Sequence, residues 1–142
     1  MATFASDFAF GIASEKANHK ILETLFNTPF TRRGGMATID FDNKDIKPEK
    51  PIYAELKSRR VKHDTYATAL IGANKVDYAA KSSSDCWFLY NYVDGIFGIQ
   101  YDKQKFDKFD KGYFQRNPRP DCNDYAQLCY YIPHSDLVKM NL

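Results

Sequence analysis

Apolar side chains recur along the chain first at helical and then at strand-like spacing. Residues 5–27 place them three or four positions apart and therefore predict a helix. Residues 37–43 and 51–59 alternate between polar and apolar positions, as strands with one buried face do. The short polar stretch 47–50 contains Pro48 and predicts a turn between them. We therefore expect an antiparallel hairpin after the first helix.

The rest of the chain predicts a second helix, two paired strands and a last short strand. The expected elements are a helix over 64–80 capped by Asp64, a buried aromatic strand over 85–93, a hairpin turn at Asp94-Gly95, a partner strand over 96–102, a polar connection over 103–112, a proline-containing loop over 114–124, a strand over 126–133 and a helical turn over 134–140. The order of helices and strands indicates an α/β fold with a mixed central sheet.

Length and composition favour one globular domain over residues 1–142. Hydrophobic residues make up 44% of the chain, which is too many for a disordered protein. The three cysteines include no CxxC motif, so neither a disulfide framework nor a zinc site is indicated. No signal peptide and no run of about 18 apolar residues is evident, so we expect an intracellular protein without a membrane span.

Charge is distributed in two adjacent blocks, although the net charge is only +2. Four acids fall between Asp40 and Glu49, and four cations fall between Lys57 and His63. Neighbouring acidic and basic patches fit a site that binds a cation and a phosphate. They also fit a solvated hairpin, which the charge pattern alone favours. His63 and His134 are not spaced as a metal-binding pair.

The hairpin places its charged side chains on one face. Glu55 and Lys57 lie two residues apart in the second strand and so point the same way. A symmetric four-residue turn would set Asp42 opposite Glu55, whereas a shift of one residue pair would set Asp40 there. In either register the face carries two or more carboxylates beside an amine. Hard cations such as Mg²⁺ prefer oxygen ligands of this kind, and phosphodiester hydrolysis commonly uses such a cation.

Asp40 or Asp42 followed by Glu55-Leu56-Lys57, with a helix on each side, resembles the PD-(D/E)XK nuclease superfamily. The stretch ELKSRRVKHDTYATALIGANKVDYA is similar to small uncharacterised members from phages and large DNA viruses. The likeness covers roughly residues 8–102. It implies a restriction-endonuclease-like αβββαβ core and, for a viral protein, a place in the host cytoplasm.

The resemblance also implies roles for particular residues. Glu55 would bind Mg²⁺, or Mn²⁺ in its place, together with Asp40 or its rival Asp42, while Lys57 would position or activate the attacking water. The Leu56 carbonyl and Glu15 of the first helix would be further ligands. DNA phosphates would be held by four cations: Arg59, Arg60, Lys62 and Lys75. Members of the superfamily often act as dimers, so a homodimer is one expected assembly.

Each of these features has a simpler interpretation. Glu55 and Lys57 would also suit a surface salt bridge, which contributes at most about 1 kcal/mol. Glu15 and Lys75 would suit exposed helix positions, and the arginines would suit a solvated strand end. The alternatives to a nuclease are therefore an inactive nucleic-acid-binding module on the same fold and a small structural or interaction protein.

Overall fold

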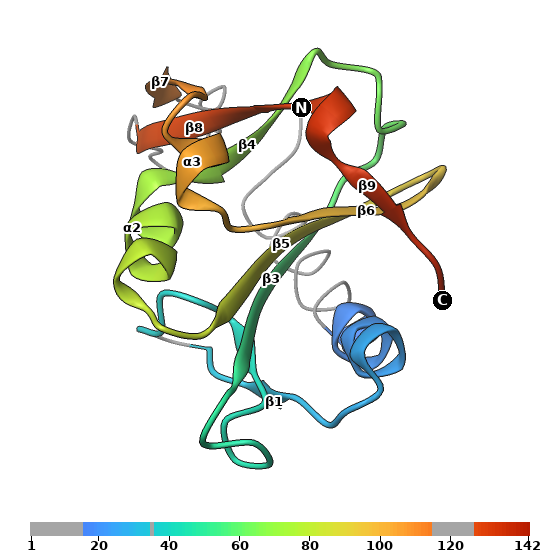
Figure 1. The fold of residues 1–142 in the computed structure, drawn as a ribbon. Coiled ribbons are helices and arrows are strands. Elements are labelled where there is room, and N and C mark those ends of the chain that lie inside the picture. Colours follow the sequence, from blue (N-terminus) through green and yellow to red (C-terminus); the bar gives the residue numbers. More distant parts are fainter. Residues whose placement is uncertain (1–15, 35, 115–126) are drawn as a thin grey trace, which may run out of the picture.

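The computed structural model describes residues 16–34, 36–114 and 127–142. Residues 16–26 are helical. The elements that follow are β1 (Thr31–Arg32), β2 (Phe41–Asp42), β3 (Ile52–Ser58), β4 (Thr68–Gly72), α2 (Ala73–Lys81), β5 (Asp85–Tyr92), β6 (Gly95–Gln100), α3 (Lys103–Phe106), β7 (Asp110–Phe114), β8 (Gln127–Pro133), a 3₁₀ turn (His134–Asp136) and β9 (Val138–Met140). Figure 1 shows their arrangement.

A mixed six-stranded sheet organises the fold, in the order β1-β2-β3-β5-β6-β9. β3 and β5 run parallel, and every other neighbouring pair in this sheet is antiparallel. The parallel pair needs a crossover connection, which here contains β4 and α2. The predicted α/β class with a mixed central sheet is confirmed.

The two faces of the sheet are covered by different layers (Figure 1). Leu22 of the N-terminal helix packs with Ala54, Leu56 and Leu89 on one face. The opposite face packs against α2 and a second sheet, which has the order β4-β8-β7. Because side chains alternate along β3, Tyr53, Glu55 and Lys57 lie on the α2 side, away from the N-terminal helix. The aromatic strand expected over 85–93 is β5, in which Tyr90 and Tyr92 are buried and Trp87 is half-buried.

The predicted helix over 64–80 is wrong in its first half. Residues 68–72 form β4, which pairs antiparallel with β8, and the helix begins only at Ala73. Ala69 and Ile71 are buried while Thr68, Leu70 and Gly72 are half-buried, which is the two-residue period of a strand. The partner strand lies some 60 residues later in the chain, so local spacing gave no sign of this pairing.

Three smaller predictions also need correction. The strand expected over 37–43 is reduced to β2, and the connection expected over 103–112 contains α3 and the start of β7. The helical turn expected over 134–140 is a 3₁₀ turn followed by β9, which adds an edge strand beside β6. The proline-containing loop lies almost entirely outside the described residues.

Asn43 sets the register of the hairpin that carries the candidate site. Its amide N–H donates to the Ile52 carbonyl at 3.2 Å, and its side-chain Oδ1 accepts from the Ile52 N–H at 2.6 Å. Phe41 is therefore paired with Ala54 and Asp42 with Tyr53. Extending this register by one pair sets Asp40 opposite Glu55. The shifted alternative is the correct one, because the loop is longer than a four-residue turn.

Candidate metal and phosphate site

Glu55 is a buried acid in the middle of β3. Only 1% of the residue's surface is exposed. Its Oε1 accepts a hydrogen bond from the Asp40 N–H at 2.8 Å. Burial and the nearby Asp40 carboxylate raise the pKa of Glu55, while Lys75, Lys57 and the hydrogen bond from Asp40 act in the opposite direction. Glu55 is not the exposed partner of a surface salt bridge.

Lys75 of α2 provides the cation nearest to Glu55. Its Nζ lies 3.4 Å from Glu55 Oε1, and it also donates to the Thr38 carbonyl. The Lys75 side chain retains 18% of its exposed surface, so the amine is held inside the site rather than in bulk solvent. DNA phosphate was the predicted partner of this lysine. In this structure it contacts the carboxylate.

Lys57 lies two residues beyond Glu55 and is paired with Tyr90 across the parallel strands. The side chain is half-buried on the same face as Glu55. Burial lowers the pKa of the Lys57 amine, and the positive charges of Arg59 and Lys75 lower it further, against the opposing effect of Glu55. A larger fraction of Lys57 is therefore neutral near pH 7 than for an exposed lysine.

The Asp42 carboxylate is paired with an arginine side chain. The Arg33 guanidinium donates from Nε and Nη2 to the two Asp42 oxygens at 2.8 Å each, and the Lys44 N–H donates to Oδ1 at 3.0 Å. Burial acts to raise the pKa of the Asp42 carboxyl, but these hydrogen bonds outweigh it and hold the pKa below its usual value. Both Asp42 oxygens are therefore already engaged by charged or polar groups of the protein.

The Leu56 carbonyl, the other predicted oxygen ligand, accepts a hydrogen bond from Asn18 Nδ2 at 3.0 Å. Asn18 is itself buried and also hydrogen-bonds the Ser58 hydroxyl. The N-terminal helix thus supports this end of β3 through a polar side chain. Glu15, the predicted ligand on that helix, lies outside the described residues.

Three of the residues predicted to bind phosphate follow directly after the C-terminal end of β3. Arg59, Arg60 and Lys62 are exposed, and the Arg59 guanidinium lies 6.0 Å from the centre of the Tyr90 ring. The Arg59 N–H donates to the Asn91 carbonyl at 2.9 Å, which fixes where this segment leaves the sheet. Because Tyr90 is the strand partner of Lys57, the basic segment begins beside the carboxylate site.

Sequence reasoning missed the three partners that shape this site. The contacts of Asn18 with Leu56 and of Lys75 with Glu55 join elements far apart in the sequence, and the contact of Arg33 with Asp42 depends on the pairing of β1 with β2. The sequence holds one local signal for such partners. β3 contains no acid besides Glu55, so any second carboxylate of the site has to come from another strand or helix.

Comparison with known proteins gave no significant match to a family model, a curated protein or a solved structure. Within the described part of the chain, no helix combines the length and apolarity needed to cross a membrane.

Proposed function

We propose that this chain is a metal-dependent nuclease that hydrolyses DNA phosphodiester bonds at Asp40, Glu55 and Lys57. One observation carries the proposal. Buried Glu55 accepts a hydrogen bond from the Asp40 N–H and lies on the same face of β3 as the half-buried Lys57. A carboxylate pair beside an amine of lowered pKa suits hydrolysis better than it suits a structural role. A fold gains little from burying such charges, because their desolvation can exceed their mutual attraction.

The order of elements supports the same proposal. A helix, three strands, a helix and a strand succeed one another in the segment from residue 16 to Tyr92, with β4 as an added strand in the crossover. This is the order of the αβββαβ core that the resemblance implies. We therefore propose a restriction-endonuclease-like core and membership of the PD-(D/E)XK superfamily.

The donor set fits Mg²⁺, with Mn²⁺ as its substitute. Asp40 and Glu55 would hold the ion, because both offer the hard oxygens that it prefers. The site also accepts a positive charge, since the Lys75 ammonium already lies 3.4 Å from Glu55 Oε1. A bound ion would neutralise phosphate charge and lower the pKa of its water.

The side chains have separate tasks in this proposal. The neutral form of Lys57 accepts a proton from the attacking water, which its lowered pKa favours near pH 7. Asp40 and Glu55 would hold the ion, whose positive charge would stabilise the reacting phosphate. Arg59, Arg60 and Lys62 bind neighbouring phosphates of the DNA, which positions the strand without reading its sequence.

Plasmid, single-stranded and branched DNA, each incubated with Mg²⁺ or Mn²⁺, test the proposal. Wild type is expected to cut at least one of them and to stop in excess chelator. Glu55→Gln and Lys57→Met are expected to be inactive. Glu49→Gln, which changes an exposed acid of the same hairpin, is the matched control and is expected to retain activity. Absence of cleavage by wild type, or cleavage by Glu55→Gln at the wild-type rate, contradicts the proposal.

A DNA-binding module without catalysis is the second candidate, and the Lys75–Glu55 contact favours it. An acid that is neutralised by a lysine of the same chain does not need a divalent ion. Titration with Mn²⁺ separates the two functions. Absence of Mn²⁺ binding together with salt-sensitive DNA binding would identify the module.

A further inference from the structure

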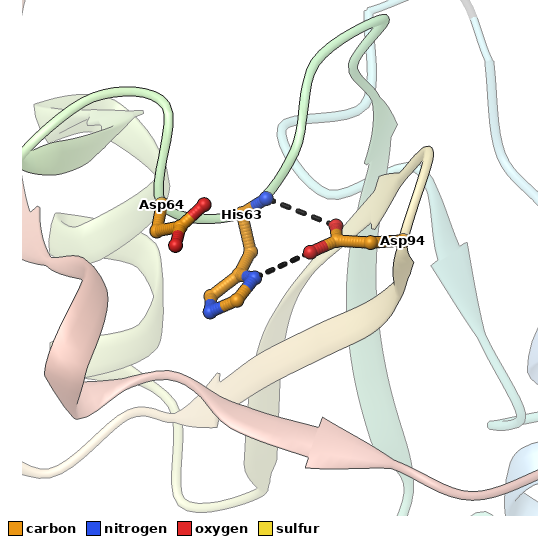
Figure 2. Close-up of side chains that lie close together, drawn as sticks. All are labelled: His63, Asp64 and Asp94. Atoms are coloured by element: carbon orange, nitrogen blue, oxygen red, sulfur yellow. Dashed lines mark hydrogen bonds and ion pairs between the residues drawn. The ribbon is translucent and has the colours of Figure 1, made fainter.

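A second cluster of metal-ligating side chains lies beyond the end of β3, apart from Asp40 and Glu55. His63 and Asp64 belong to the connection between β3 and β4, and Asp94 belongs to the turn between β5 and β6. One ligand atom from each of the three residues lies within 4.8 Å of the other two. Figure 2 shows the imidazole between the two carboxylates.

The imidazole of His63 is held firmly. Asp94 accepts two hydrogen bonds from this residue, one from His63 Nδ1 at 2.6 Å and one from the His63 N–H at 3.0 Å (Figure 2). The ring stacks on Phe97, with 4.1 Å between the ring centres and 10° between the planes. A side chain fixed in this way loses little conformational freedom on binding a ligand.

Asp64 differs from its neighbours in the cluster. Its carboxylate is exposed and makes no hydrogen bond or ion pair with any residue in the described ranges of the chain. The carboxylate therefore remains available to a ligand from solution. The His134 ring lies next to the cluster as well, with its centre 6.1 Å from that of His63 and its plane turned by 74°.

We propose that His63, Asp64 and Asp94 form a binding site for a divalent transition metal such as Zn²⁺. One imidazole nitrogen with two carboxylate groups is a ligand set that Zn²⁺ and its neighbours in the first transition row accept in proteins. Mg²⁺ prefers oxygen ligands alone, so the nitrogen donor separates this site from the one at Asp40 and Glu55. Zn²⁺ bound by His63 Nδ1 and both carboxylates would displace the proton that Nδ1 now donates to Asp94. Ligand atoms of a tetrahedral zinc lie about 3.4 Å apart, so the 2.6 Å pair of His63 and Asp94 would open slightly, while the Asp64 carboxylate would move inward from within 4.8 Å.

The ion would connect two segments that are distant in the sequence. Arg59, Arg60 and Lys62 precede His63 directly, and the turn at Asp94 connects two strands of the central sheet. Binding would hold the basic segment against that turn and would raise the unfolding temperature, because the unfolded chain lacks the assembled site. This inference does not depend on nuclease activity.

Titration of the chelator-treated full chain with Co²⁺, followed by competition with Zn²⁺, tests the site. Wild type is expected to bind Co²⁺ with visible absorption bands that Zn²⁺ abolishes, and Zn²⁺ is expected to raise the unfolding temperature. His63→Gln and Asp64→Asn are each expected to weaken binding by tenfold or more. Because Asp64 is exposed and makes no contact that the fold requires, Asp64→Asn remains informative even if His63→Gln fails to fold.

Two control variants locate the bound ion. His19→Gln changes a histidine on the N-terminal helix, on the other face of the sheet, and Glu55→Gln removes the nuclease site. His19→Gln is expected to bind Co²⁺ as wild type does. Glu55→Gln would lose any Co²⁺ held by the carboxylates of Asp40 and Glu55, but it is expected to keep the visible bands that come from the His63 site. No Co²⁺ or Zn²⁺ binding by wild type, or unchanged affinity in Asp64→Asn, overturns the proposal. Loss of this binding in Glu55→Gln also overturns it, because the ion would then belong to the carboxylate–lysine site.

Discussion

At the scale of single residues, Glu55 is a carboxyl group whose buried position opposes its own ionisation. Its raised pKa means that, at a given pH, the protonated form is more populated in the folded protein than in the unfolded chain. Such a group contributes its full stability below the pKa of the unfolded chain and loses that contribution as pH rises through the folded pKa. A buried acid that weakens the fold at neutral pH is typical of a site retained for function.

Glu55→Gln is therefore expected to be at least as stable as wild type at pH 8 without divalent ions. Each unit by which the Glu55 pKa is raised lowers the wild-type free energy of unfolding by about 1.4 kcal/mol above that pKa. Glutamine does not ionise and can still accept the Asp40 N–H. Urea unfolding at pH 5 and pH 8 measures the difference, which should favour the variant more at pH 8. A loss of 2 kcal/mol or more at pH 8 would show that Glu55 is structural.

Lys75→Met is expected to bind Mn²⁺ more tightly than wild type. The Lys75 ammonium lies 3.4 Å from Glu55 Oε1, where it competes with a divalent ion for the carboxylate. Removing it should strengthen binding by about tenfold, or 1.4 kcal/mol. Calorimetric titration measures the change, and Lys81→Met, at an exposed position of the same helix, is the matched control. Weaker binding in Lys75→Met would mean that this lysine supports the ion rather than competing with it.

Among the secondary-structure elements, the local sequence was sufficient to predict β3 but not to predict β4. The two-residue period of β3 placed Glu55 and Lys57 on one face without knowledge of any partner. The register opposite Glu55 was not predictable, because the side chain of Asn43 caps the loop in a way that turn length alone does not specify. β4 was mistaken for helix because its partner β8 lies far along the chain. The contact of Lys75 with Glu55 was not predictable from local spacing, because it joins α2 to β3.

Gly98 of β6 marks a place where the central sheet tolerates no side chain. A Cβ at this position would lie 2.8 Å from Leu89 Cδ2 and 3.1 Å from Leu89 Cγ, in a buried part of the sheet. Gly98→Ala is expected to lower the free energy of unfolding by about 1–3 kcal/mol through overpacking.

Gly112→Ala provides the comparison for this variant. A Cβ at Gly112 would meet the hydroxyl end of the Tyr131 side chain, a half-buried residue of the second sheet, so a smaller loss of stability is expected. Urea unfolding of both variants measures the difference. An equal effect at the two positions would contradict the assignment of Gly98 to the tightly packed layer.

At the scale of the whole molecule, function depends on how charge is arranged, since the net charge is only +2. The carboxylate site and the basic segment after β3 both lie on the α2 side of the sheet or at its edge, whereas Lys16 and Lys20 belong to the helix on the other face. This arrangement predicts that DNA contacts one side of the molecule.

The salt dependence of DNA binding tests this arrangement. With Ca²⁺ present to prevent cleavage, Arg60→Gln/Lys62→Gln is expected to weaken binding and to reduce the slope of log affinity against log salt by about 2, or 0.9 for each lost phosphate contact. Lys16→Gln/Lys20→Gln removes the same charge from the opposite face and is expected to leave the slope unchanged. Equal slopes in the two double variants would contradict a one-sided DNA surface.

The identity of the acid opposite Glu55 gives the most direct test of the nuclease proposal. The register and the Arg33 contacts predict that Asp40, rather than Asp42, is the metal ligand. The measurement is the single-turnover rate of DNA cleavage in Mn²⁺ for Asp40→Asn and Asp42→Asn, well below the unfolding temperature of each. We expect Asp40→Asn to lose at least about a hundredfold in rate and Asp42→Asn to lose less than about tenfold. Equal or reversed losses, or a wild type that cuts no DNA, would contradict this account of the site.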